Sequence, residues 1–132
     1  MRERYGPMLA RGATTLWESF EPTASLCHGF SATPTYQLSR RVLGVAPAAP
    51  GFAEIELAPD LADLDHAEGV VPTPRGDVEA RLERTKAGFV ARYRTPEGVG
   101  ACAVPPPGFA IVDWPGLTGT EIEISLDRKS VV

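Results

Sequence analysis

Glu18 and His28 are two side chains near the beginning of the chain whose types and spacing could do chemistry together. Glu18 ends the sequence Gly-Ala-Thr-Thr-Leu-Trp-Glu over residues 12–18, and His28 lies within Ser-Leu-Cys-His-Gly-Phe-Ser-Ala over residues 25–32. A carboxylate can serve as a general acid or base, and a neutral imidazole can donate one hydrogen bond while it accepts another. The spacing therefore predicts a site in which a carboxylate and an imidazole lie side by side.

Other roles for these residues stay open on the sequence alone. Thr15 and Glu18 fit a capping box, in which the glutamate carboxylate accepts a hydrogen bond from the backbone N–H of the residue that begins a helix. His28 stands next to a glycine and could be a loop or cap residue. Cys27 directly precedes His28, but adjacent side chains rarely point at each other and no oxyanion motif accompanies them, so a cysteine hydrolase is not favoured.

Two aromatic residues flank the candidate pair. Trp17 directly precedes Glu18, and Phe30 follows His28 by two positions. The apolar face of an aromatic ring is a usual platform for the C–H face of a sugar. Trp17 is thus a candidate for substrate contact. Neighbouring residues point to different sides of a helix or strand, however, so packing in the core is the alternative for Trp17.

The overall composition disfavours several classes of protein. The chain has 132 residues and a net charge of -4, with Lys and Arg scattered along it, which gives no electrostatic reason to expect a nucleic acid partner. No apolar run approaches the roughly 20 residues that cross a bilayer, and the N-terminus lacks the apolar core of a signal peptide. We therefore expect a cytoplasmic protein with no membrane partner.

Cysteine and histidine usage points to neither a disulfide framework nor a metal site. Cys27 and Cys102 lie far apart in segments of different kind, so we expect free thiols. His28 and His66 are not part of a tight ligand spacing, and His66 is expected on the surface between strands. We expect no metal and no other cofactor.

The first 44 residues have the features of two short helices. The first helix is expected to end at Gly12, and the second, capped by Ser31 or Thr33, is expected to run to Leu43. Gly44 then suits the left-handed conformation that ends many helices. The sequence pattern changes at residue 45, where a segment rich in proline and alanine is followed by alternating polar and apolar residues.

The remainder of the chain is expected to form an antiparallel β-sandwich. The alternation indicates about six strands joined by turns rich in glycine and proline, and residues 78–83 and 89–94 make the clearest hairpin. We place the domain boundary between residues 47 and 48, so that the fold is mainly β with an N-terminal helical segment. The other expected strands cover residues 54–57, 98–104, 109–112 and 121–126.

The two motifs resemble the last active-site segment of bacterial α-L-rhamnosidases, glycoside hydrolase family 78. The resemblance extends through Tyr36, residues 43–45, residues 50–52 and residues 67–76. It implies that residues 1–47 are the last helices of an (α/α)6 catalytic barrel and that residues 48–132 are the C-terminal sandwich domain. The interval between Glu18 and His28 is shorter than in many family members, and many relatives carry tryptophan where Phe30 stands.

The resemblance also implies a function. The family consists of inverting enzymes that act on terminal α-L-rhamnosides, and it assigns Glu18 the role of general base and His28 that of a ligand of sugar hydroxyls. The general acid of the family lies on earlier barrel segments that this chain lacks. We therefore expect the isolated chain to be inactive and the remainder of the barrel, in the same or another chain, to be its partner.

Two further hypotheses stay open. The chain could be a non-catalytic carbohydrate-binding or structural sandwich module, with Trp114, Tyr93 or Phe109 as exposed rings that hold a sugar. It could also be one part of a split enzyme, in which a separate chain supplies the rest of the barrel. In that case the apolar faces of the two N-terminal helices would form the interface.

Overall fold

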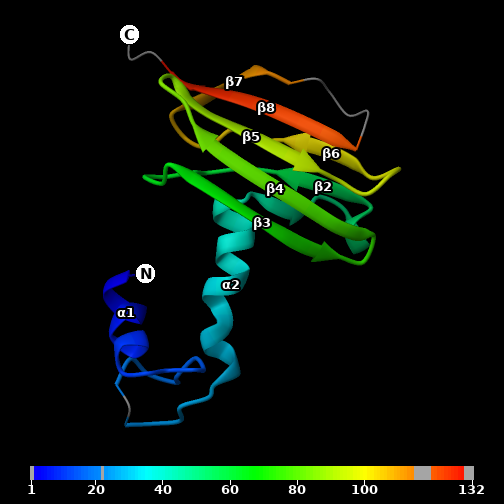
Figure 1. Cartoon of the computed structure of the whole chain (residues 1–132). Helices are drawn as coiled ribbons and strands as arrows, with labels where there is room; N and C mark the ends of the chain where they lie inside the picture. Colours follow the sequence, from blue (N-terminus) through cyan, green and yellow to red (C-terminus); the bar gives the residue numbers. More distant parts are fainter. Residues whose placement is uncertain (1, 22, 115–119, 130–132) are drawn as a thin grey trace. The chain divides into compact units, whose positions relative to one another are not determined.

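The computed structural model describes residues 2–21, 23–114 and 120–129. The chain divides into two compact units, Met1–Gln37 and Leu38–Val132. The division falls ten residues before the boundary expected from the sequence, because the residues that precede the first predicted strand already pack with the β-sheets. Colour in Figure 1 follows the chain from the helical unit in blue to the sheets in green through red.

The first unit is helical, as expected. Helix α1 (Arg2–Ala10) is followed by Gly12 with a φ of 79°, and this left-handed conformation confirms the glycine end. A long loop leads to the 3₁₀ turn η1 (Gly29–Ala32) and to α2 (Thr33–Gln37), which carries Pro34 in its first turn. Among the described residues, no helix has the length and apolar character needed to span a membrane.

The second unit begins with a helical turn of unusual type. Residues Leu38–Val42 form the π-helical turn η2, so the predicted second helix reaches its expected end but not as a continuous α-helix. Gly44 then has a φ of 75°, and a Cβ atom there would lie 2.3 Å from the carbonyl carbon of Ala58. Glycine at this position therefore provides both the left-handed turn and the space for the passing chain.

One sheet of the sandwich has three strands in the order β1-β2-β6. Strand β1 (Val45–Pro47) runs antiparallel to β2 (Glu54–Leu57), with the 3₁₀ turn η3 (Pro50–Phe52) between them. Strand β6 (Gly100–Ala103) runs parallel to β2. The expected sandwich of mainly antiparallel strands is confirmed, and the pairing of β2 with β6 is an exception, since a crossover connection brings β6 beside β2 in the same direction.

The other sheet has five strands, all antiparallel, in the order β3-β4-β5-β8-β7. The predicted hairpin is confirmed, with Leu82 opposite Ala91. His66 does not lie between strands as expected, because it opens β3 as an exposed residue. The strand bounds are β3 (His66–Thr73), β4 (Gly76–Arg84), β5 (Gly88–Arg94), β7 (Phe109–Asp113) and β8 (Glu121–Arg128).

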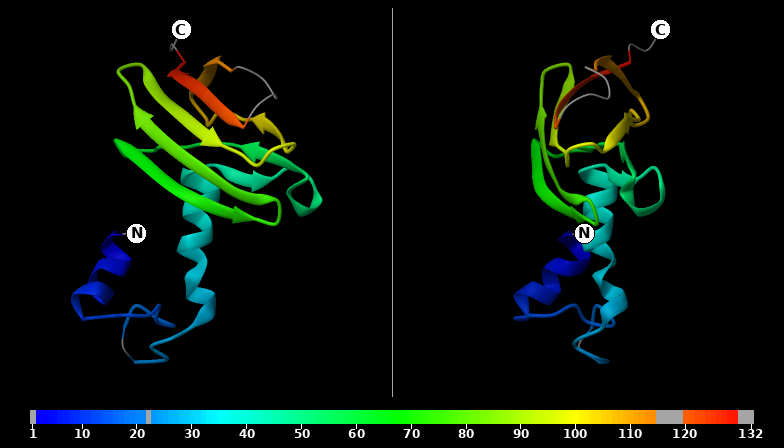
Figure 2. Two further views of the ribbon diagram at one scale, coloured as in Figure 1. Left: turned by 45° about the vertical axis from the view of Figure 1, so that its right-hand side comes forward. Right: turned by 90° about the vertical axis from the view of Figure 1, so that its right-hand side faces the viewer.

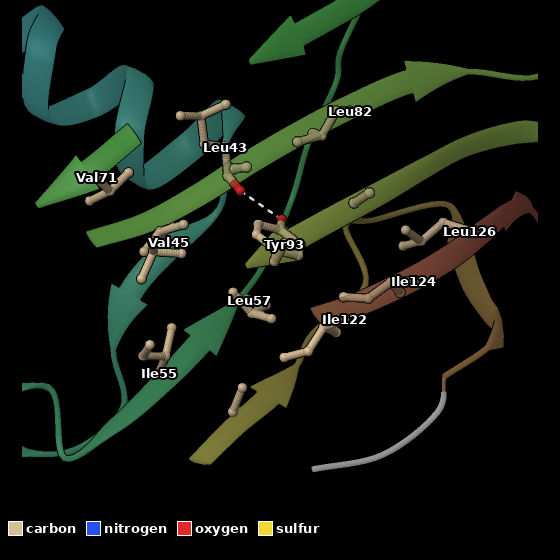
Figure 3. Packing of buried hydrophobic residues seen from close by; sticks show 14 of the residues in the cluster. Leu43, Val45, Ile55, Leu57, Val71, Leu82, Tyr93, Ile122, Ile124 and Leu126 are labelled. Atoms are coloured by element: carbon tan, nitrogen blue, oxygen red, sulfur yellow. Dashed lines mark hydrogen bonds between the residues drawn. The ribbon is translucent and has the colours of Figure 1, made fainter. Parts of the chain in front are cut away.

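The hydrophobic core lies between the two sheets, which face each other in the right-hand view of Figure 2. The apolar residues of the predicted alternations point inward, as the period of two requires. Tyr93 is also buried there, and its hydroxyl donates a hydrogen bond of 2.7 Å to the carbonyl oxygen of Leu43 (Figure 3). The core includes Val45, Ile55, Leu57, Leu61, Val71, Val78, Leu82, Phe89, Ala91, Ile122, Ile124 and Leu126.

Candidate functional site

Backbone hydrogen bonds bring the two sequence motifs together. The N–H of Glu18 donates to the carbonyl oxygen of Ser25, and the N–H of His28 donates to the carbonyl oxygen of Leu16, each at 2.8 Å. The Thr15 hydroxyl adds a third link, since it donates to the carbonyl oxygen of Leu26. The segments before and after the loop tip thus lie side by side, and Glu18 and His28 are held on neighbouring backbone.

The Glu18 carboxylate lies next to the His28 ring. Its Oε2 atom accepts a hydrogen bond of 3.2 Å from the Ser25 N–H and lies 3.6 Å from the His28 Nδ1 atom. The two side chains are 41% and 36% exposed, respectively, so both can be reached by water or a ligand. The structure therefore places the carboxylate and the imidazole side by side, as the spacing predicts.

The capping-box alternative for Glu18 is wrong. No helix begins at Thr15, because residues 13–18 have no helical conformation, and the Glu18 carboxylate binds the Ser25 N–H across the loop instead. The loop therefore uses this carboxylate to fasten its own far side. That hydrogen bond uses one lone pair of the Oε2 atom, and the Glu18 side chain remains 41% exposed to solvent.

His28 stands directly before the turn η1 but does not cap it with its side chain. Its ring instead meets the ring of Phe30, with centroids 4.3 Å apart and planes inclined at 60°. One ring nitrogen thus faces the carboxylate, and the ring packs in a tilted arrangement against an aromatic neighbour. These contacts orient the imidazole within the loop.

The two candidate rings differ in exposure. Trp17 is buried, with 7% of its surface exposed, whereas Phe30 is 66% exposed. The burial of Trp17 favours the packing alternative, and substrate contact by Trp17 stays a prediction. Sequence reasoning singled out Trp17 because of its place beside Glu18; the signal that separates the rings is side-chain burial, which adjacency does not predict.

The aromatic residues proposed for a sugar-binding sandwich are not free rings. Tyr93 is 3% exposed and is hydrogen bonded in the core. Trp114 and Phe109 are partly buried against the core, and the Phe109 ring packs edge-on against Phe89 with centroids 5.2 Å apart. Since stacking on a sugar requires an open ring face, these three residues do not support the binding-module hypothesis.

The thiols and potential metal ligands do not form a second site. In the part of the chain that the structure describes, no three His, Cys, Asp or Glu side chains are arranged to hold a metal ion. Cys27 is exposed and Cys102 is partly buried, and neither forms a disulfide. Burial raises the pKa of the Cys102 thiol, and the nearby carboxylates of Glu54 and Glu56 raise it further.

A hollow of about 760 Å³ lies over the outer face of the five-stranded sheet. Arg92 pairs there with Glu123 at 2.5 Å and Arg94 with Glu79 at 3.1 Å, and Arg92 also pairs with Glu83, outside the hollow, at 2.7 Å. These charged groups neutralise one another across the strands and remain about half exposed. Because both arginines are already paired with carboxylates, this face has the character of a solvated surface.

Comparison with known proteins identifies the family. The family model "Bacterial alpha-L-rhamnosidase C-terminal domain" matches residues 44–108. An alpha-L-rhamnosidase of Alteromonas sp. (strain LOR) is 31% identical over 138 residues, which cover 87% of this chain and 15% of that protein.

Solved structures agree with this match. A rhamnosidase of glycoside hydrolase family 78 from Bacillus sp. GL1 is 35% identical, with a TM-score of 0.71 over 80% of this chain and 12% of that chain. An alpha-L-rhamnosidase from Dictyoglumus thermophilum shares the fold at 21% identity, with a TM-score of 0.67 over 94% of this chain and 16% of that chain. The chain thus spans only about a sixth or less of these relatives, and it belongs, as a C-terminal portion, to the bacterial alpha-L-rhamnosidases of glycoside hydrolase family 78.

Proposed function

We propose that this chain supplies the final part of the catalytic region, and the sandwich that follows it, of an inverting hydrolase of terminal α-L-rhamnosides. The observation that carries the proposal is the Glu18–His28 pair, with Glu18 Oε2 lying 3.6 Å from His28 Nδ1 in an open loop. The family match covers residues 44–108 of the adjoining sandwich, and the 31% identical relative, which is called an alpha-L-rhamnosidase, aligns with 87% of the chain.

Glu18 acts as the general base in this proposal. Inversion requires one carboxylate that removes a proton from the attacking water and one carboxylic acid that protonates the leaving oxygen, about 6.5–9.5 Å apart. Glu18 is open to water, and the Ser25 N–H fixes one of its oxygens. His28 presents Nδ1 to this carboxylate, which leaves Nε2 to bind a sugar hydroxyl.

A second carboxyl group must come from elsewhere. Glu21, on the same loop, is already paired with Arg11 at 2.9 Å. Several large apolar side chains of the helical unit are exposed: Leu9 by 71%, Tyr36 by 57% and Leu26 by 49%. Exposed apolar groups of this size favour a covering partner. The partner that we propose is the rest of the catalytic barrel, in the same or another chain, which also brings the acid.

Hydrolysis of 4-nitrophenyl α-L-rhamnoside tests the proposal. The 132-residue chain alone should be inactive, and the polypeptide or complex that also contains the barrel should release nitrophenol. Glu18→Gln in the active form should lower kcat by about 10²–10⁴-fold, because a positioned general base contributes about this much. Glu21→Gln, a carboxylate of the same loop, is the matched control and should change kcat less than about threefold.

The stereochemistry of the product provides an independent check. An inverting enzyme releases β-L-rhamnose first, and proton NMR during the first minutes distinguishes this anomer from the α form. Activity of the isolated chain that is lost in Glu18→Gln would overturn the missing-acid argument. Full activity of Glu18→Gln in the complete enzyme would refute the assignment of the base.

A further inference from the structure

Phe30 is an exposed aromatic residue that touches the candidate site. Its side chain is 66% exposed, and its ring lies 4.3 Å from the His28 ring, centroid to centroid. A single exposed apolar side chain needs no explanation, but an open aromatic ring in contact with a polar pair has the composition of a ligand site. The position therefore calls for an explanation beyond packing within the helical unit.

Backbone hydrogen bonds hold Phe30 and His28 in the same turn. The carbonyl oxygen of Phe30 accepts hydrogen bonds from both the N–H and the hydroxyl of Thr33, the latter at 2.9 Å. The N–H of Ser31 donates to the carbonyl oxygen of His28 at 3.1 Å. These bonds close the turn η1 and hold the backbones of His28 and Phe30 in one turn, in which the two rings meet.

Other apolar side chains of the unit do not have this placement. Leu26 and Tyr36 are exposed, but neither makes a described ring contact with His28. Trp17 is adjacent to Glu18 in sequence but is only 7% exposed. Exposure together with contact to the site therefore distinguishes Phe30 from these three residues.

We propose that Phe30 is the apolar platform on which the C–H face of the sugar packs while its hydroxyls meet His28 and Glu18. This inference rests on the proposed function of the Glu18–His28 site and adds a substrate-binding residue to it. A sugar ring has hydroxyls along its edge and C–H groups on a face, so a polar pair next to an open ring suits both parts. The sugar in question is a 6-deoxyhexose, whose methyl group adds to the apolar surface that an aromatic ring can cover.

Phe30→Leu in the complete, active enzyme tests the platform. Leucine keeps an apolar side chain of similar volume but lacks the flat face, so we expect KM for 4-nitrophenyl α-L-rhamnoside to rise about tenfold with kcat changed less than about twofold. Phe30→Trp should restore KM to within about twofold, because tryptophan offers a larger flat face. If Phe30 served folding alone, KM would not depend on whether the side chain at position 30 has a flat aromatic face.

Tyr36→Leu is the matched control, since Tyr36 is a large side chain of the same unit with similar exposure to Phe30 but no described ring contact with His28. It should leave KM unchanged. The platform is refuted if Phe30→Leu leaves KM within twofold of the wild type, or if Tyr36→Leu raises KM equally. Glu18→Gln separates the two proposals: if it abolishes turnover while Phe30→Leu has no effect on KM, only the platform fails. An enzyme that keeps full activity without the Glu18 carboxylate would refute both.

Discussion

Tyr93→Phe should destabilise the sandwich by removing one buried hydrogen bond. The Tyr93 hydroxyl donates to the carbonyl oxygen of Leu43 at 2.7 Å, and the two residues are only 3% and 8% exposed. Without the hydroxyl, the Leu43 carbonyl is left buried and unpaired. A buried polar group without a partner costs about 1–3 kcal/mol, and for a domain of this size about 2 kcal/mol lowers Tm by about 8–16 °C.

The same hydroxyl makes stability depend on alkaline pH. Burial raises the pKa of Tyr93 far above its ordinary value of 10.0. Above pH 10 the unfolded chain therefore loses a proton that the folded chain keeps, so the free energy of unfolding falls as pH rises. The loss is about 1.4 kcal/mol at pH 11. Because Tyr93→Phe cannot lose this proton, its deficit relative to the wild type should shrink by that amount.

Urea unfolding followed by circular dichroism at pH 7 and pH 11 measures both effects. Tyr36→Phe, at an exposed position, is the control and should match the wild type at both pH values. The reasoning is refuted if Tyr93→Phe is as stable as the wild type at pH 7. It is also refuted if the difference between the two proteins stays constant as the pH rises.

Two further substitutions or treatments test the turn glycine and the thiols. Gly44→Ala should lower the free energy of unfolding, measured in urea, by more than about 3 kcal/mol, because the new Cβ atom would lie 2.3 Å from the backbone of Ala58. Gly98 also has a positive φ, of 74°, but has open space around it, so the control Gly98→Ala should cost only about 1 kcal/mol. Equal losses in the two variants would contradict the predicted clash. Cys27 should react with a disulfide reagent at pH 8 well before Cys102, whose pKa is raised by burial; mass spectrometry of the modified peptides would reveal the reverse order if the argument is wrong.

The sequence predicted strands where side chains alternate strictly and missed β1 and β3, where they do not. Strands β4, β5 and β8 each place apolar residues on one face, so their existence and their buried face followed from the period. In β3, Val71 alone is fully buried, and Gly69 and Pro72 are residues that strands usually avoid. The structure shows why glycine stands at position 69: a Cβ atom there would lie only 2.9 Å from the Leu43 side chain.

Strand pairing was harder to predict than strand identity. Alternation shows which face of a strand is buried, but it does not name the neighbouring strand. The parallel partnership of β2 and β6 depends on the packing of the whole sandwich, and nothing local in Glu54–Leu57 encodes it. The π-helical turn η2, in which the Leu43 N–H bonds to the carbonyl oxygen of Leu38 five residues earlier, was likewise not predicted from the sequence.

For the site, residue types and spacing predicted that Glu18 and His28 belong together, and the structure brings them to 3.6 Å. The means by which the loop does so was not predictable. The capping box and the cross-loop contact use the same residues, and only the backbone bonds from Glu18 to Ser25 and from His28 to Leu16 decide between them. Their catalytic role stays a prediction.

The parallel pair also has a consequence for the order of folding. Strands β3, β4 and β5 are joined by tight turns, so each finds its partner close by in the sequence. Strand β2 must wait for β6, because Glu54 pairs with Gly100 across all three of those strands. During synthesis β1 and β2 are therefore the first strands of the sandwich to be made, but their sheet is completed late. One edge of β2 has no partner until residue 103 has left the ribosome. We expect this edge to be where newly made chains pair wrongly with one another.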